Sequence, residues 1–162
     1  MKRRRRESAL NNFLKALASK KAGDSFASID LTGESLIGVD FCQRVFDHSI
    51  FYECDLSRAN LGDTSLQNTD IRKTILLLTN FEGANCHQAE FNDARVTLAT
   101  FNDARLIQAD FSGALLRGVE FQRADLTGAN FENAIVKNCD FSGADLTGAY
   151  FTPEQKSSIR KV

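Results

Sequence analysis

Two histidines and four cysteines are the side chains of this sequence best suited to general-base, nucleophilic or metal-binding chemistry near neutral pH. The cysteines are Cys42, Cys54, Cys86 and Cys139, and their separations of 12, 32 and 53 residues match no zinc-ligand or redox motif. His48 and His87 lie far apart in the sequence, and no nucleophile motif accompanies either. The sequence therefore identifies no catalytic, cofactor-binding or metal-ligating residue, and we expect a protein that is not an enzyme.

The composition is that of one ordinary domain, with 43% hydrophobic and 25% charged residues among 162. No apolar run approaches the roughly 20 residues that a membrane-spanning helix needs, so we expect no membrane insertion. The start Met1–Arg6 is strongly basic, but no apolar segment of a signal peptide follows it. With the cysteines interpreted as reduced thiols, these features predict a cytoplasmic protein.

A five-residue period organises most of the chain. Every fifth residue from Phe26 to Phe151 is apolar, which gives twelve Phe, ten Leu and four smaller apolar residues in succession. Two residues before each of these, from Ala59 to Ala149, thirteen of nineteen positions hold Ala and four hold Thr. Because successive side chains of an extended segment point to opposite faces, each large and small pair should point inward together.

The remaining residues of each unit must turn the chain. Eight of the ten glycines stand two residues after the large apolar position, where a type II turn requires positive φ. Asp or Asn occupies the same position in other units and tolerates the same conformation. The sequence therefore predicts short extended segments that are joined by regular corners.

These units resemble the pentapeptide-repeat family, whose unit reads A(D/N)LXX and is matched closely by Ala124–Phe131. The resemblance covers about residues 26–152 and implies an all-β fold, a right-handed quadrilateral β-helix with twenty residues per coil. Residues 31–150 would then form about six coils, a rod roughly 30 Å long. Some members of the family protect or inhibit DNA gyrase by resembling duplex DNA, so the resemblance also implies gyrase as a candidate partner.

The chain ends are expected to cover the rod. Residues 1–25 should form a basic tail and an amphipathic capping helix whose apolar face holds Leu10, Phe13, Leu14 and Leu17, with Lys2–Arg6 outside the helix. Residues 153–162 should form a short C-terminal helix and tail, which begins after a capping box made by Thr152 and Gln155. Glu34 and Arg44 occupy small inward positions, so we expect a distorted or capped first coil.

Charge differs among the four sides of the predicted rod. Over residues 31–150 the side through Phe41 and Phe101 carries a net −5, the side through Phe51 and Phe111 a net −4, and the side through Phe46 is weakly acidic. Duplex DNA carries one charge per about 1.7 Å, so about 30 Å of DNA would hold roughly 18 charges. The net charge of −8 over these residues is about half of that value.

The fourth side presents apolar and basic residues outward. We define the stripe as these nine residues: Ile75, Leu77, Leu78, Leu98, Leu115, Ile135, Arg95, Arg117 and Lys137. Arg58 accompanies them, and Asp55 is the one acid at the outward positions of this side. Exposed apolar patches mark contact surfaces. The alternative is that the N-terminal helix folds back along the rod and covers Ile75, Leu77 and Leu78.

Two functions are compatible with this pattern. The first is an interaction scaffold that docks a protein partner, or a second copy as a homodimer, through the stripe. The second is a DNA-mimicking, gyrase-binding protein that acts through an acidic surface comprising Asp70, Glu90 and Asp110. We expect no direct specific binding of nucleic acid, and the positive, apolar stripe favours the scaffold because DNA has no such side.

Overall fold

Residues twenty positions apart lie side by side along the whole repeat. On one side, parallel bridges connect Asp30 with Ile50, Ile50 with Asp70, and each later coil with the next as far as Asn130 and Tyr150. The other sides are bridged at the same interval of twenty residues. Backbone hydrogen bonds connect the same neighbouring coils, for example from Phe81 N to Thr100 O at 2.8 Å. The predicted coil of twenty residues is therefore confirmed, and the chain forms a right-handed quadrilateral β-helix.

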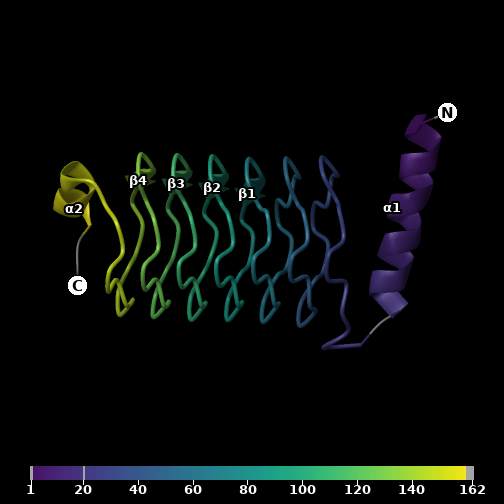
Figure 1. Ribbon diagram of the computed structural model, residues 1–162, viewed down its shortest axis with the longest axis horizontal. Coiled ribbons are helices and arrows are strands. Elements are labelled where there is room, and N and C mark those ends of the chain that lie inside the picture. Colours follow the sequence, from purple (N-terminus) through teal and green to yellow (C-terminus); the bar gives the residue numbers. More distant parts are fainter. Residues whose placement is uncertain (1, 20, 160–162) are drawn as a thin grey trace.

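The structure, a computed structural model, describes residues 2–19 and 21–159. Its helices are α1 (Lys2–Ser19) and α2 (Pro153–Ser158), and its strands are β1 (Ile75–Leu77), β2 (Arg95–Thr97), β3 (Leu115–Arg117) and β4 (Ile135–Lys137). The strands lie one above another in successive coils, while the two helices lie at opposite ends of the stack (Figure 1). The other sides consist of single-residue bridges between turns.

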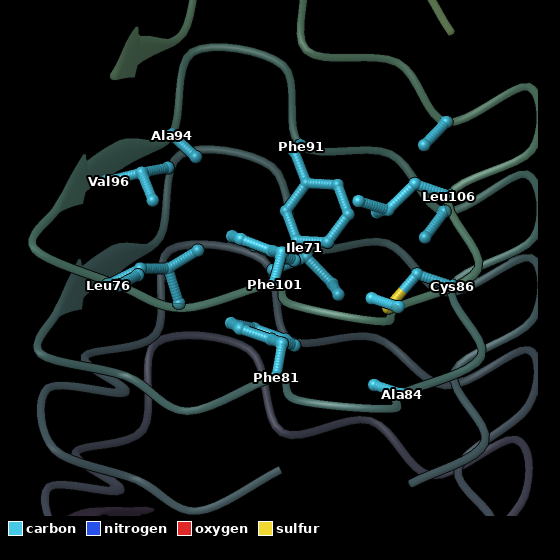
Figure 2. Packing of buried hydrophobic residues seen from close by; sticks show 14 of the residues in the cluster. Ile71, Leu76, Phe81, Ala84, Cys86, Phe91, Ala94, Val96, Phe101 and Leu106 are labelled. Atoms are coloured by element: carbon cyan, nitrogen blue, oxygen red, sulfur yellow. The ribbon is translucent and has the colours of Figure 1, made fainter. Parts of the chain in front are cut away.

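The inward positions form one continuous core along the rod (Figure 2). Phe81 stacks on Phe101 with ring centroids 4.5 Å apart and planes 6° apart, and Phe91 stacks on Phe111 at 4.6 Å. The two columns meet edge to face, as Phe91 and Phe101 do at 84°. Such geometry suits the quadrupoles of the rings. The inward residues between the columns are buried Ala residues. They are small because the stacked rings leave space for little more than a methyl group.

The N-terminal helix lies across the first coil and does not run along the rod (Figure 1). Leu17 is buried, and the Phe13 ring meets the rings of Phe26 and Phe46 at centroid distances of 5.5 and 6.4 Å. The alternative in which this helix covers Ile75, Leu77 and Leu78 is therefore wrong. The prediction that Lys2–Arg6 lies outside the helix is also wrong, because α1 begins at Lys2. Lys and Arg are good helix formers.

The backbone of the first coil is regular, so of the two expected alternatives the distortion is wrong, while α1 packs on this coil as a cap. Bridges begin at Ser25, which pairs with Val45. Glu34 and Arg44 remain half-buried next to the capped end, and the Arg44 Nη1 donates a hydrogen bond to the carbonyl of Cys42 at 2.9 Å. The cap therefore accommodates these two polar side chains without a change of backbone path.

The C-terminal helix begins with the predicted capping box. The Gln155 backbone N–H donates to Thr152 Oγ1, and the Thr152 backbone N–H donates to Gln155 Oε1. The amide of Gln155 also donates to the carbonyls of Phe131 and Ala134 at 2.9 and 2.6 Å. One side chain thus starts α2 and satisfies two acceptors of the final coil. The predicted tail at residues 160–162 lies outside the described residues.

Candidate interaction surface

The stripe is organised by the parallel sheet of β1 to β4. Its register gives a first row of Ile75, Arg95, Leu115 and Ile135 and a second row of Leu77, Thr97, Arg117 and Lys137. Between these rows, the buried residues Leu76, Val96 and Leu116 hold the sheet on the core. The outward side chains of one row are separated by the coil spacing of about 4.8 Å, so they form one contiguous surface.

The apolar members of the stripe are exposed. Leu98 is 57% exposed and Leu78 47%, while Ile75, Leu77 and Ile135 range from 38% to 49%. Leu115 is half-buried. The structure therefore brings the predicted apolar residues together on one side and leaves five of the six exposed.

Leu78 and Leu98 occupy corners with left-handed backbone conformations, with φ of 56° and 53°. Gly118 and Asn138 hold the equivalent corners in the next two coils. A left-handed conformation costs an ordinary L-residue about 1 kcal/mol or more, while Gly and Asn adopt it readily. The two leucines are therefore unfavourable for the fold at their positions.

The cations of the stripe have no acidic partner in the fold as described. The ion pairs among the described residues join Arg72 to Asp70 and Glu90, and Arg123 to Asp103. On the stripe's own side, the Asp55 carboxylate accepts a hydrogen bond from the Ser57 N–H at 3.0 Å. Arg95, Arg117 and Lys137 thus remain available to a carboxylate from outside.

Sequence reasoning missed one residue of this side. Ile37 is 55% exposed and precedes Leu77 by two coils in the second row. Its spacing of forty residues from Leu77 was the signal that could have revealed it. The apolar character of this side therefore begins in the first repeat coil, before β1.

The alternative acidic surface is a straight row, because Asp70 pairs with Glu90 and Glu90 with Asp110. Arg72 neutralises part of it, since its guanidinium contacts Asp70 at 2.7 Å and Glu90 at 3.1 Å. Burial alone would raise the pKa of Asp70, but the hydrogen bonds and charge of Arg72 outweigh burial and lower the pKa. A polar groove of about 710 Å³ runs along this side and includes the Lys73–Tyr52 hydrogen bond of 2.8 Å.

The cysteines show no activation. Burial raises the pKa of Cys54 to about 11 and raises that of Cys86 further, and the Cys54 thiol donates to the Leu31 carbonyl. Desolvation, followed by the charges of nearby acids, raises the pKa of the half-exposed Cys42. Burial also raises the pKa of the partly buried Cys139. A reactive thiol needs a lowered pKa, so none of the four is activated, and the buried Cys54 and Cys86 act as small packing groups.

The histidines lie on an outer side of the rod. The carboxylate of Asp47, the residue before His48, forms hydrogen bonds with groups of the next coil. It accepts hydrogen bonds from Ser65 Oγ at 2.7 Å and from the Gln67 N–H at 2.9 Å. Within residues 2–19 and 21–159, no group of three or more His, Cys, Asp or Glu side chains is arranged to hold a metal ion. Asp47 thus joins two coils and does not orient a base.

Sequence comparison matches the repeat directly. A model described as pentapeptide repeat region matches residues 65–131, and one described as pentapeptide repeats (8 copies) matches residues 25–63 and 124–152. The chain belongs to the pentapeptide-repeat family. The pentapeptide-repeat models together therefore span almost the whole solenoid between α1 and α2.

Solved pentapeptide-repeat structures resemble this chain. A pentapeptide repeat protein from the Arabidopsis thaliana thylakoid lumen is 30% identical, with a TM-score of 0.62, over 78% of this chain and 74% of that one. A pentapeptide repeat protein from the cyanobacterium Cyanothece 51142 is 19% identical, with a TM-score of 0.49, over 89% and 99% of the two chains. QnrB1, a plasmid-mediated fluoroquinolone resistance protein, is 21% identical, with a TM-score of 0.45, over 78% and 74%. The last two likenesses concern the fold alone.

Two further comparisons bear on this pentapeptide-repeat chain. Among curated proteins, none matches it in sequence. Neither helix in the part of the chain that the structure describes has the length and apolar character needed to cross a bilayer.

Proposed function

We propose that this pentapeptide-repeat protein is a non-enzymatic interaction scaffold that docks a protein partner through the stripe, and that it does so in the cytoplasm. Pentapeptide-repeat proteins are generally structural or binding proteins, which supports the absence of a catalytic role. The four reduced cysteines support a reducing compartment.

The observation that carries the proposal is the pair of exposed leucines at strained corners. Leu78 and Leu98 take up a conformation that Asn or Gly adopts at lower cost, and each exposes about half of its side chain. The left-handed conformation recurs at corners on every side, where Gln, Arg and Asn also adopt it. Leu78 and Leu98 differ from those residues because they expose a large apolar side chain there, and this exposure supports a role in binding.

The rigidity of the sheet supports the same proposal. The outward side chains of β1 to β4 project from residues whose neighbours are fixed in the core, such as Leu76 and Val96. A surface held in this way loses little conformational entropy when a partner binds. Apolar groups and Arg are also the residue types enriched at the centre of protein interfaces.

The second candidate is a DNA-mimicking protein that binds gyrase through its acidic sides. The alignment of Asp70, Glu90 and Asp110 in one row favours it. The contacts of Arg72 with Asp70 and Glu90 weaken it, because a phosphate backbone carries no such internal neutralisation. We rank it below the scaffold for this reason.

A quantitative pull-down tests the ranking. Wild type should capture a partner that the double variant Leu78→Asn/Leu98→Asn does not, while Asp70→Lys/Glu90→Lys/Asp110→Lys should capture it normally. The opposite result, with loss only for the acidic variant and capture of gyrase by wild type, would support DNA mimicry. Circular dichroism of the three proteins checks that each retains the β-helix.

A further inference from the structure

We propose that the occupant of the stripe is a single amphipathic segment of a partner protein, apolar at one end and acidic at the other. This inference rests on the proposed function. It identifies the chemistry of the partner from the charges and the layout of the surface.

Charge complementarity requires an acidic occupant. Arg95, Arg117 and Lys137 lie on one face with Arg58, and Asp55 is already bound to its own turn. Rows of unpaired cations favour carboxylates placed opposite them, both in affinity and in the rate of association. A neutral or basic partner would leave these charges opposed or desolvated without compensation.

A second copy of this chain does not provide that complement. Two stripes face to face would place Arg95, Arg117 and Lys137 of both copies in one interface, where the cations would be desolvated with no acidic partner from either stripe. The acidic sides of a second copy would complement the cations of the stripe, but they would offer no matching apolar surface to its leucine and isoleucine side chains. Among the described residues, the other large exposed apolar side chains away from the stripe's side are Ile50 and Tyr150.

The flanking sides restrict the width of the occupant. In chain order the stripe lies between the side that holds Asp70 and Glu90 and the side that holds Glu82 and Asp103, and both sides are acidic. A broad acidic surface would meet repulsion on both flanks, while one helix or strand can remain over the stripe. A single element about 10 Å wide therefore fits the pattern.

The distribution along the rod gives the occupant a direction. The outward residues of β1 and its corner are Ile75, Leu77 and Leu78, with no cation among them. Each of β2, β3 and β4 carries one cation, beside Leu115 on β3 and Ile135 on β4. Three coil steps of about 4.8 Å separate β1 from β4, a span of about 14 Å that roughly ten helical residues would cover. The apolar end of the segment should therefore bind at β1 and its carboxylates at β2 to β4.

Selection from a displayed library of random peptides tests this inference. Peptides of about 16 residues allow roughly four helical turns, enough to span the stripe. Wild type should enrich peptides in which Leu, Ile or Phe residues are followed or preceded by a cluster of Asp and Glu. The triple variant Arg95→Glu/Arg117→Glu/Lys137→Glu should bind those peptides at least about tenfold more weakly, since three charge pairs become repulsive.

Arg105→Glu is the matched control. Arg105 occupies the same repeat position as Arg95, before a buried residue, but it lies ten residues further along and thus on the opposite side of the rod. Its reversal should leave peptide binding unchanged. The neutral variant Arg95→Gln/Arg117→Gln/Lys137→Gln supplies a second measurement, in which added salt should no longer weaken binding.

The remaining outcomes separate this inference from the proposed function. Enriched peptides that require Leu78 and Leu98 but contain no excess of acid would overturn the acidic occupant and keep the scaffold. No enrichment over the Leu78→Asn/Leu98→Asn variant would overturn both. Self-association in sedimentation that the leucine changes abolish would identify a second copy as the occupant and overturn the inference.

Discussion

The Cδ2 atom of Leu98 lies 2.9 Å from the position that a Cβ on Gly118 would occupy, so the leucine side chain leans over the glycine of the next coil. Gly118 supplies both the positive φ of that corner and the space for this contact. The stripe's surface at this corner is thus formed by one leucine extended over the neighbouring coil.

Replacement of Leu78 and Leu98 by Asn should stabilise the fold while it abolishes partner binding. Asn accepts the left-handed corner, so the free energy of unfolding should rise by about 1–2 kcal/mol for the pair, less the loss of the partial contact with Gly118. Chemical denaturation measures this change in the free energy of unfolding. Asn68→Leu, at a corner with φ of 53° on another side, should have the reverse effect, and a similar loss of stability in both variants would refute the strain argument.

A phenylalanine at position 104 should destabilise the rod, while one at position 105 should not. Ala104 is buried beside the stacked rings of Phe101 and Phe121, and overpacking costs about 1–3 kcal/mol or more. Arg105 is exposed, so the same ring there should change stability by no more than about 0.5 kcal/mol. Equal melting temperatures of Ala104→Phe and Arg105→Phe would show that the inward positions are assigned wrongly.

Gln155→Ala should loosen the C-terminal end. The change leaves the carbonyls of Phe131 and Ala134 without their donor, at a cost of about 1–3 kcal/mol per buried unsatisfied group. Hydrogen exchange should rise in the final coil and remain unchanged near β1. Lys156→Ala, one residue further along α2, is the control, and comparable exchange in the two variants would argue against the role of Gln155.

Thiol labelling should be slow in the native protein. The raised pKa of Cys42 reduces its thiolate fraction at neutral pH, and burial protects Cys54 and Cys86 as well as raising their pKa values. Labelling with an aromatic disulfide at neutral pH should therefore be far faster after denaturation. Raising the pH should accelerate the native reactions of Cys42 and Cys139 first, because those two thiols are partly exposed while Cys54 and Cys86 are buried. Rapid native labelling at neutral pH would contradict the assignment of these cysteines to packing.

The period of five residues made the fold predictable. It specified the inward residues, and Thr152 and Gln155 specified the start of α2, because each of these depends on local sequence. The path of α1 was not predictable in the same way, since its apolar face fits either the end of the rod or the leucines of the stripe. The packing of Phe13 on Phe26 and Phe46 decides between them, and it is a tertiary contact that no local pattern encodes.

The stripe itself was visible in the sequence once sides were assigned at intervals of twenty. The strain at Leu78 and Leu98 was visible in part, because the corner position was known to prefer Gly or Asn. The bridging of Asp70 and Glu90 by Arg72 was not, because it depends on side-chain rotamers.

Site-specific photo-crosslinking distinguishes binding through the stripe from binding through the acidic surface. A photoreactive amino acid is placed at Leu77 in one protein and at Glu90 in another, two exposed positions that represent the stripe and the acidic surface. Both proteins are irradiated with the same cell extract or with the selected peptides. If the stripe is the docking surface, a specific partner should be crosslinked from position 77 and none from position 90. A partner crosslinked from position 90 and absent from position 77 would contradict docking through the stripe.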